Sequence, residues 1–197
     1  MDSFNGMGWI GIVSFHMTGV RLHGLPPIPG TVSFPQVNVR TYVILDGKPG
    51  IYFLSLDATN RLAASIARTF YKLPYHYADI IIKYNQSGID FNSKRGSINK
   101  AGLVCNYRPI SKQYYAAKGT FDDWMAERYC FYTLNIKGVL RCDVLHQPWL
   151  LQEAEAEISH NTLLTKQEIY VEKEMPVFHF SKRMEVRTWS LIPAFEG

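Results

Sequence analysis

The sequence has few cysteines, and their arrangement excludes two classes of small protein. Cys105, Cys130 and Cys142 are the only three in 197 residues, and none belongs to a CxxC pair. An odd number of widely spaced thiols indicates neither a disulfide framework nor a zinc ribbon. The six histidines show no HxH or HExxH spacing either. We therefore predict no metal site.

Long apolar runs and blocks of charge are also missing. No apolar stretch approaches the ~18 residues that a membrane helix needs, and the first residues, MDSFNGMGWIG, carry an acid where a secretory signal would be basic. Lys and Arg number 21 against 17 Asp and Glu, a net charge of +4, with no more than two adjacent basic residues. We predict a cytoplasmic protein with no membrane or nucleic-acid partner.

The usual signatures of acyl and phosphoryl transfer, a GxSxG elbow and a Walker loop, do not occur. A GxGxxG pattern is present at residues 6–11. A dinucleotide site would need a strand before this pattern and a helix after it, whereas here no strand can precede it and a strand-like run follows. The sequence therefore predicts no cofactor.

Aromatic residues are what the chain has in abundance. It contains 4 Trp, 12 Tyr and 11 Phe, which is 14% of all residues, and 47% of the chain is hydrophobic. Aromatic side chains suit pleated sheets and ligand cavities, and this hydrophobic content is enough for a buried core. We find no repeat or linker and predict one domain over residues 1–197.

Most of the chain has the pattern of short strands, which predicts a β-rich α+β fold. Apolar periodicity predicts one main helix over 59–70, capped by Asp57 or Thr59, and a short helix over 120–126 with Thr120 as its cap. Asp46-Gly47 predicts a hairpin, which Lys48-Pro49 would lengthen beyond two loop residues. Strands are expected at 9–15, 37–45, 50–56, 80–84, 89–93, 103–107, 139–145, 153–158, 177–180 and 186–191, and one or two helical turns at 161–167.

A polar strand face provides the first candidate ligand-binding residues. With the alternation of a strand, Gln36, Asn38 and Arg40 point to one side. Such residues are unusual in a core and suitable for a cavity wall. The competing interpretation is that Arg40 forms an ion pair with Glu127 or Asp57.

Two further clusters carry groups that can ionise. His76 lies between two tyrosines, Tyr75 and Tyr77, and histidine changes charge near neutral pH; its alternative role is a hydrogen-bonded structural histidine. In Glu127-Arg128 the arginine is a second candidate for anion binding. A structural salt bridge is the alternative there.

These clusters, in this order, resemble the YqjF-like family, a group of uncharacterised proteins in the acetoacetate decarboxylase-like superfamily. The similar segments span nearly the whole chain: DSFNGMGWIGIVSF, GLPPIPG, FPQVNVRTYV, DGKPGIYFLSLDA, LPYHYA, ERYCFYTL, HQPWLLQEAEAEI and VRTWSLIP. The resemblance implies a mostly antiparallel, cone-like or barrel-like double sheet around a central cavity. It also implies that this chain starts inside the domain and lacks its first strands.

The chain departs from the family pattern at the expected site. Gln36 stands where the family commonly has Glu, which puts general-base chemistry there in doubt. The superfamily's decarboxylases form a Schiff base on a lysine, and the resemblance places Tyr75 and His76 at their lysine-pair positions. Neither side chain can form an imine. Lys72 is the nearest lysine in the sequence, but it precedes Pro74 and is therefore a poor substitute for the lysine pair. The decarboxylase reaction is therefore not carried over with the fold.

The leading hypothesis is a protein that binds a small anionic or carbonyl-bearing molecule, such as a carboxylate or keto acid. Its ligand-binding residues would be Gln36, Asn38, Arg40, Tyr75, His76 and Arg128. If a reaction follows, His76 or Tyr75 would transfer the proton. Two alternatives stay open: an enzyme that uses a displaced lysine, and a non-catalytic ligand sensor or assembly module. The sequence also leaves homo-oligomers open.

Overall fold

Strands account for most of the regular structure, as the sequence predicted. The computed structural model describes residues 1–19, 33–96, 101–169 and 176–195; the segment GLPPIPG lies outside them. The described strands are β1 (Ile10–Thr18), β2 (Ser33–Leu45), β3 (Lys48–Ala58), β4 (Tyr75–Asn85), β5 (Gly88–Arg95), β6 (Gly102–Pro109), β7 (Tyr114–Tyr115), β8 (Cys130–Asn135), β9 (Gly138–His146), β10 (Leu150–Asn161), β11 (His179–Phe180), β12 (Val186–Thr188) and β13 (Ile192–Pro193).

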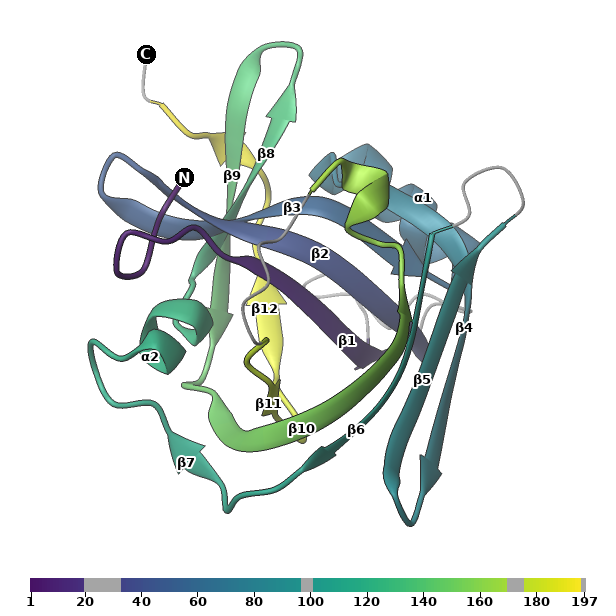
Figure 1. The fold of residues 1–197 in the computed structure, drawn as a ribbon. Helices are drawn as coiled ribbons and strands as arrows, with labels where there is room; N and C mark the ends of the chain where they lie inside the picture. Colours follow the sequence, from purple (N-terminus) through teal and green to yellow (C-terminus); the bar gives the residue numbers. More distant parts are fainter. Residues whose placement is uncertain (20–32, 97–100, 170–175, 196–197) are drawn as a thin grey trace.

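The strands form one mixed sheet that curls on itself (Figure 1). Its main path is β11-β10-β6-β5-β4-β3-β8-β9-β12, and β2 joins β3 on one side and β1 on the other. Most pairs are antiparallel, whereas β3 pairs in parallel with both β4 and β8. In Figure 1, β1 and β2 cross the molecule opposite β10 and β6. The β-rich α+β prediction is confirmed.

The helices are few and close to their predicted positions. The described ones are α1 (Arg61–Tyr71), α2 (Phe121–Ala126) and a 3-10 turn (Thr165–Gln167). The predicted cap of α1 was wrong, because the Asn60 side chain accepts the hydrogen bond from the Ala63 amide at 2.9 Å. The Thr120 cap of α2 is confirmed.

The hairpin between β2 and β3 is tighter than predicted. Leu45 pairs with Lys48, so the loop consists of Asp46 and Gly47 alone. Both have positive φ, 49° and 74°, as a two-residue type I′ turn requires. Pro49 does not lengthen the loop because it lies inside β3, where it is exposed.

Two hydrophobic clusters lie on opposite sides of β2 and β3. The first contains Val37 and Val39 with side chains from β4, β5 and β6. The second contains Leu56 with Phe131 and Cys142 from β8 and β9. Strands β2 and β3 therefore contribute to both clusters, because successive side chains along each strand point to opposite sides.

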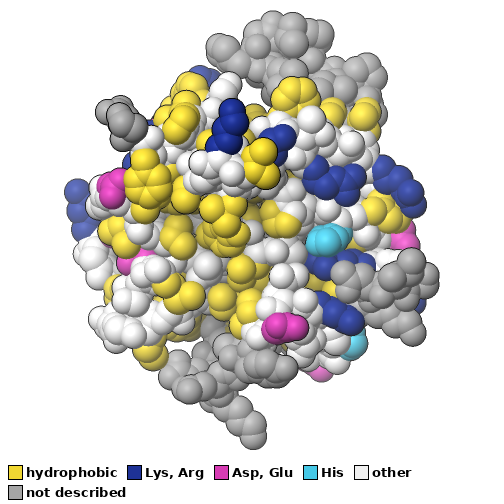
Figure 2. Space-filling view, turned by 90° about the horizontal axis from the view of Figure 1, so that it is seen from above, with side chains coloured by type: hydrophobic (Ala, Val, Ile, Leu, Met, Phe, Trp, Pro, Cys, Tyr) yellow, Lys and Arg dark blue, Asp and Glu magenta, His cyan; other side chains and the backbone are white. Residues whose placement is uncertain are grey.

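The surface is uneven in charge although the net charge is small. Figure 2, seen from above, shows hydrophobic side chains over the centre and left of this face. Most of the Lys and Arg side chains on it lie toward the right, together with two histidines. Other Lys and Arg side chains lie among hydrophobic ones near the upper centre of the view, so the two kinds of side chain are only partly segregated on this face.

Candidate functional site

Three predicted residues form a polar row on β2. The register between β1 and β2 is unbroken from Ile10↔Thr41 to Thr18↔Ser33, so Gln36, Asn38 and Arg40 point to one side. We call that side the open face and the side with Val37 and Val39 the closed face. Gln36 is 2% and Asn38 4% exposed, so both are buried, whereas Arg40 is half-buried.

Tyr75 joins this row from β4. Its hydroxyl donates a hydrogen bond to Gln36 Oε1 at 3.2 Å, and its ring packs with the cluster around Leu56. Burial raises the pKa of Tyr75 to about 12, despite the hydrogen bond with Gln36. The phenol therefore stays protonated at neutral pH and acts as a hydrogen-bond donor, not as a base.

Arg40 does not form the ion pair that the sequence suggested as an alternative. Asp57 pairs with Arg95, while Glu127 accepts hydrogen bonds from the Tyr129 hydroxyl and the Trp149 amide. Within the described residues, the buried Nε of Arg40 and the buried Oδ1 of Asn38 make no hydrogen bond. The row thus contains a cation and an amide oxygen whose partners are not supplied by these parts of the chain.

A glycine on β1 provides the space for the Arg40 side chain. Gly11 is the register partner of Arg40. A Cβ at Gly11 would lie 3.2 Å from the Tyr42 hydroxyl and 3.4 Å from both Cγ and Nε of Arg40. The Arg40 stem and the Tyr42 hydroxyl therefore both lie over Gly11.

Arg128 lies beyond Tyr42, in an aromatic cage. Its Cζ is 5.2 Å from the Tyr42 ring centroid and 4.6 Å from that of Trp124. Unlike Arg40 it has a carboxylate partner in the described structure: Nη1 donates to Asp2 Oδ2 at 2.6 Å, and Nε donates to the Trp124 carbonyl. The sequence did not predict Asp2 as the partner, because 126 residues separate the two.

His76 lies on the closed face, away from the row. Neighbouring residues of a strand point to opposite sides, and Asp57 is the register partner of His76 across the parallel β3–β4 pair. Burial and the cation of Arg95 lower the pKa of His76, against the opposing effect of Asp57. Of the six predicted site residues, the structure brings Gln36, Asn38, Arg40, Tyr75 and Arg128 to the open face and separates His76 from them.

Asp57 and Arg95, which the sequence did not single out together, form a buried ion pair on the closed face. Arg95 donates from Nε to both carboxylate oxygens at 2.8 and 2.9 Å, and its Nη2 lies 2.7 Å from Oδ1. The two side chains are 3% and 1% exposed. Burial raises the pKa of Asp57, and Arg95 opposes this effect.

The geometry gives the row the groups of an anion receptor. Arg40 supplies a cation and the Gln36 and Asn38 amides supply NH2 donors, while the Tyr75 hydroxyl donates its proton to Gln36. Lys72 does not join them, because it ends α1 in the left-handed conformation (φ 54°) with an exposed side chain.

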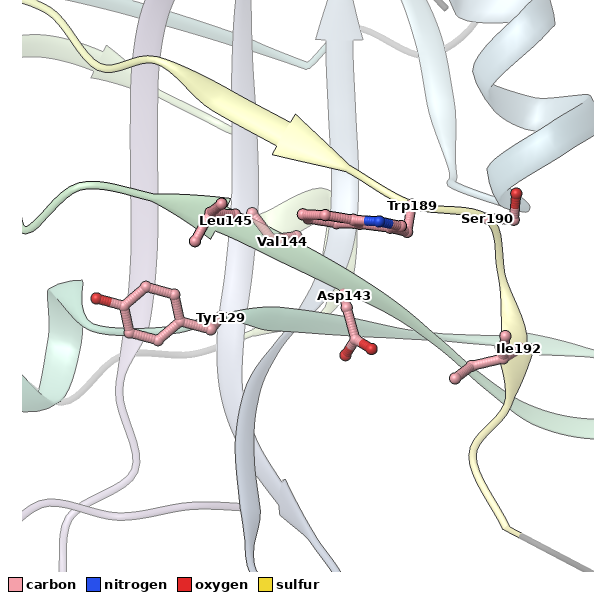
Figure 3. Close-up of a pocket in the computed structure, with 7 residues that line it drawn as sticks. All are labelled: Tyr129, Asp143, Val144, Leu145, Trp189, Ser190 and Ile192. Carbon is pink, nitrogen blue, oxygen red and sulfur yellow. The ribbon is translucent and has the colours of Figure 1, made fainter. Parts of the chain in front are cut away.

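A pocket of about 580 Å³ lies at a different place, beside β9 (Figure 3). Figure 3 shows the Trp189 ring extending along β9 toward Val144 and Leu145, with Tyr129 at the far end. The other lining residues are Asp143, Ser190 and Ile192. None of the predicted site residues lines this pocket.

Comparison with known proteins identifies the family. The model of the DUF2071 family, described as an uncharacterized conserved protein, matches residues 1–185. This chain belongs to the DUF2071 family. It is similar to the uncharacterized protein YqjF of Bacillus subtilis (strain 168), with 46% identity over 191 residues that cover 97% of this chain and 79% of YqjF. The predicted resemblance to YqjF-like proteins is confirmed.

Solved structures extend the likeness to the fold. The acetoacetate decarboxylase of Legionella pneumophila is 14% identical with a TM-score of 0.50, over 93% of this DUF2071 chain and 84% of the decarboxylase. The enduracididine biosynthesis enzyme MppR, in complex with pyruvate, is 9% identical with a TM-score of 0.53, over 83% of this chain and 66% of MppR. At these identities the likeness shows the acetoacetate decarboxylase-like fold and no activity.

One further observation concerns membranes. Among the described residues, no helix combines the length and the apolar character that a membrane span requires.

Proposed function

We propose that this DUF2071 protein is a cytoplasmic protein that binds a small carboxylate or keto acid on the open face of β2. In this proposal Arg40 pairs with the anionic group, and Asn38, Gln36 and Tyr75 hydrogen-bond the rest of the molecule. The observation that carries the proposal is the unpaired Nε of Arg40, which is buried without a hydrogen bond in the described structure.

The energetic argument rests on the cost of burying an unsatisfied polar group. Such a group typically costs about 1–3 kcal/mol, and more when it is charged. On the other side of the same strands Arg95 has the Asp57 carboxylate as an ion-pair partner, whereas no carboxylate pairs with Arg40 among the described residues. A ligand carboxylate would supply Arg40 with such a partner.

The proposal is for binding and does not include the decarboxylase reaction. That reaction needs a lysine that forms an imine, and the positions to which the resemblance assigned the lysine pair hold Tyr75 and His76. The pyruvate complex of MppR, which has a similar fold, supports a keto acid as one ligand class. Borohydride trapping with keto acids, read by intact mass, tests the displaced-lysine alternative, which predicts a covalent adduct.

A panel of carboxylates and keto acids, measured by thermal shift and then by calorimetry, tests the proposed function. A ligand that binds only the folded state raises the melting temperature. We expect such a shift for the wild type and for Arg108→Gln, a matched control in which an exposed arginine that pairs with Glu155 is replaced. Arg40→Gln should lose it. The proposal is wrong if no acid binds, or if Arg40→Gln binds as tightly as the wild type.

A further inference from the structure

The row on β2 continues past Arg40 to a second arginine. Arg40 and Tyr42 both lie over Gly11, and the Arg128 guanidinium lies over the Tyr42 ring. Alternate residues of a strand are about 7 Å apart. The open face therefore presents two cations in sequence, separated by one tyrosine.

The two cations differ in whether their charge is neutralised. Asp2 Oδ2 accepts hydrogen bonds from Arg128 Nη1 at 2.6 Å and from Trp124 Nε1 at 3.1 Å. The backbone amide of Asp2 donates to the Tyr42 carbonyl at 2.9 Å, which fixes the carboxylate beside the cage. No such carboxylate reaches Arg40 among the described residues.

Asp2 is held in the ionised state by these contacts. Burial alone would raise its pKa, but the hydrogen bond and the charge of Arg128 outweigh burial, and the net pKa is lowered. At neutral pH the Asp2 carboxylate therefore occupies the position on Arg128 that a second ligand carboxylate would take.

We propose that Asp2 is a specificity-determining residue: by neutralising Arg128 it leaves Arg40 as the single available cation of the row, so that the site selects monocarboxylates over dicarboxylates. This inference rests on the proposed function and deepens it. A dicarboxylate in the wild-type site would place its second anion near Arg128 and Asp2, where the charge is already balanced and the Asp2 carboxylate repels it.

The test uses pairs of acids that differ by one carboxylate: pyruvate with oxaloacetate, and 2-oxobutyrate with 2-oxoglutarate. Calorimetry on the wild type should give at least about tenfold tighter binding of the monocarboxylate in each pair. Asp2→Asn keeps the size of the side chain and an oxygen for the Trp124 bond but frees Arg128. It should raise the affinity for the dicarboxylates about tenfold and leave the monocarboxylates nearly unchanged.

The outcomes separate the two proposals. If no acid binds the wild type, the proposed function fails and takes this inference with it. If the wild type binds acids through Arg40 but does not prefer monocarboxylates, or if a folded Asp2→Asn protein keeps the wild-type preference, only the role of Asp2 is overturned.

Asp79→Asn is the matched control, because Asp79 is an exposed carboxylate that accepts a hydrogen bond from Tyr77. If Asp2→Asn fails to fold, the wild-type preference together with Asp2→Ser decides the question.

Discussion

The two faces of β2 and β3 each carry an arginine, and the two arginines differ in whether a carboxylate pairs with them. On the closed face, Arg95 and Asp57 form an ion pair and are almost inaccessible. On the open face, Arg40 and Asn38 leave buried atoms without a partner in the described structure. The two arginines therefore differ in pairing, and also in burial, because Arg95 is fully buried and Arg40 is half-buried. The proposed function assigns the missing partner of Arg40 to a bound ligand.

Breaking the pair on the closed face should have the largest effect. Arg95→Met leaves the Asp57 carboxylate buried without a counter-ion, and removing one partner of a buried pair typically costs about 3–5 kcal/mol. Urea unfolding followed by circular dichroism measures the loss. In the control Arg108→Met, which opens an exposed pair with Glu155, the loss should stay below about 1 kcal/mol. Equal losses in the two variants would mean that the burial of the Arg95–Asp57 pair does not increase its contribution to stability.

The corresponding change on the open face should alter binding and not stability. Arg40→Met removes a cation that pairs with no carboxylate of the described residues, so we expect the free energy of unfolding to fall by less than about 1 kcal/mol, or to rise. Carboxylate affinity should fall at least about tenfold, as calorimetry would show. A stability loss as large as that of Arg95→Met would mean that Arg40 serves the fold.

Gly11→Ala tests the space that the open face reserves for Arg40. The added Cβ would lie 3.2–3.4 Å from Tyr42 and Arg40 atoms, so these side chains must shift. We expect a destabilisation of about 1 kcal/mol and weaker carboxylate binding. Gly96→Ala is the control, since a Cβ there meets nothing within 4 Å. Unchanged binding in Gly11→Ala would show that the position of Arg40 is not critical.

The smallest effect should come from His76 on the closed face. Its folded-state pKa is lowered by burial and Arg95, so between that value and the unfolded value of about 6.5 the unfolded chain binds more protons. Stability therefore falls as pH drops below about 6.5. Urea midpoints at pH 7.5 and 5.5 should differ more in the wild type than in His76→Gln. If His76→Gln kept the wild-type pH dependence of stability, a group other than His76 would be responsible for it.

Local patterns in the sequence were enough to predict the fold class. The alternation in 153–158 predicted part of β10, and apolar periodicity placed α1 to within two residues at its start. The details that failed depend on single hydrogen bonds, such as the choice of Asn60 over Asp57 as the cap. Asp57 was already engaged by Arg95, a contact across 38 residues.

The candidate site was predictable where strand alternation determines it. The shared side of Gln36, Asn38 and Arg40 follows from a period of two along β2. The same rule places Tyr75 and His76 on opposite sides of β4, although their adjacency in sequence suggested one joint site. The partners of Arg95 and Arg128 come from distant segments, and no local pattern contains that information.

The parallel pairing of β3 with β8 has a consequence for the order of folding. β3 reaches β2 through a two-residue turn and β4 through α1, whereas Ile51 pairs with Phe131 across 80 residues. Closing so long a loop costs conformational entropy, and this cost is offset only after the contacts between β3 and β8 have formed. We expect β2, β3 and β4 to assemble early and the β8–β9 hairpin to dock late. Substitutions in β8 should then mainly accelerate unfolding, while those in β2 and β3 slow folding.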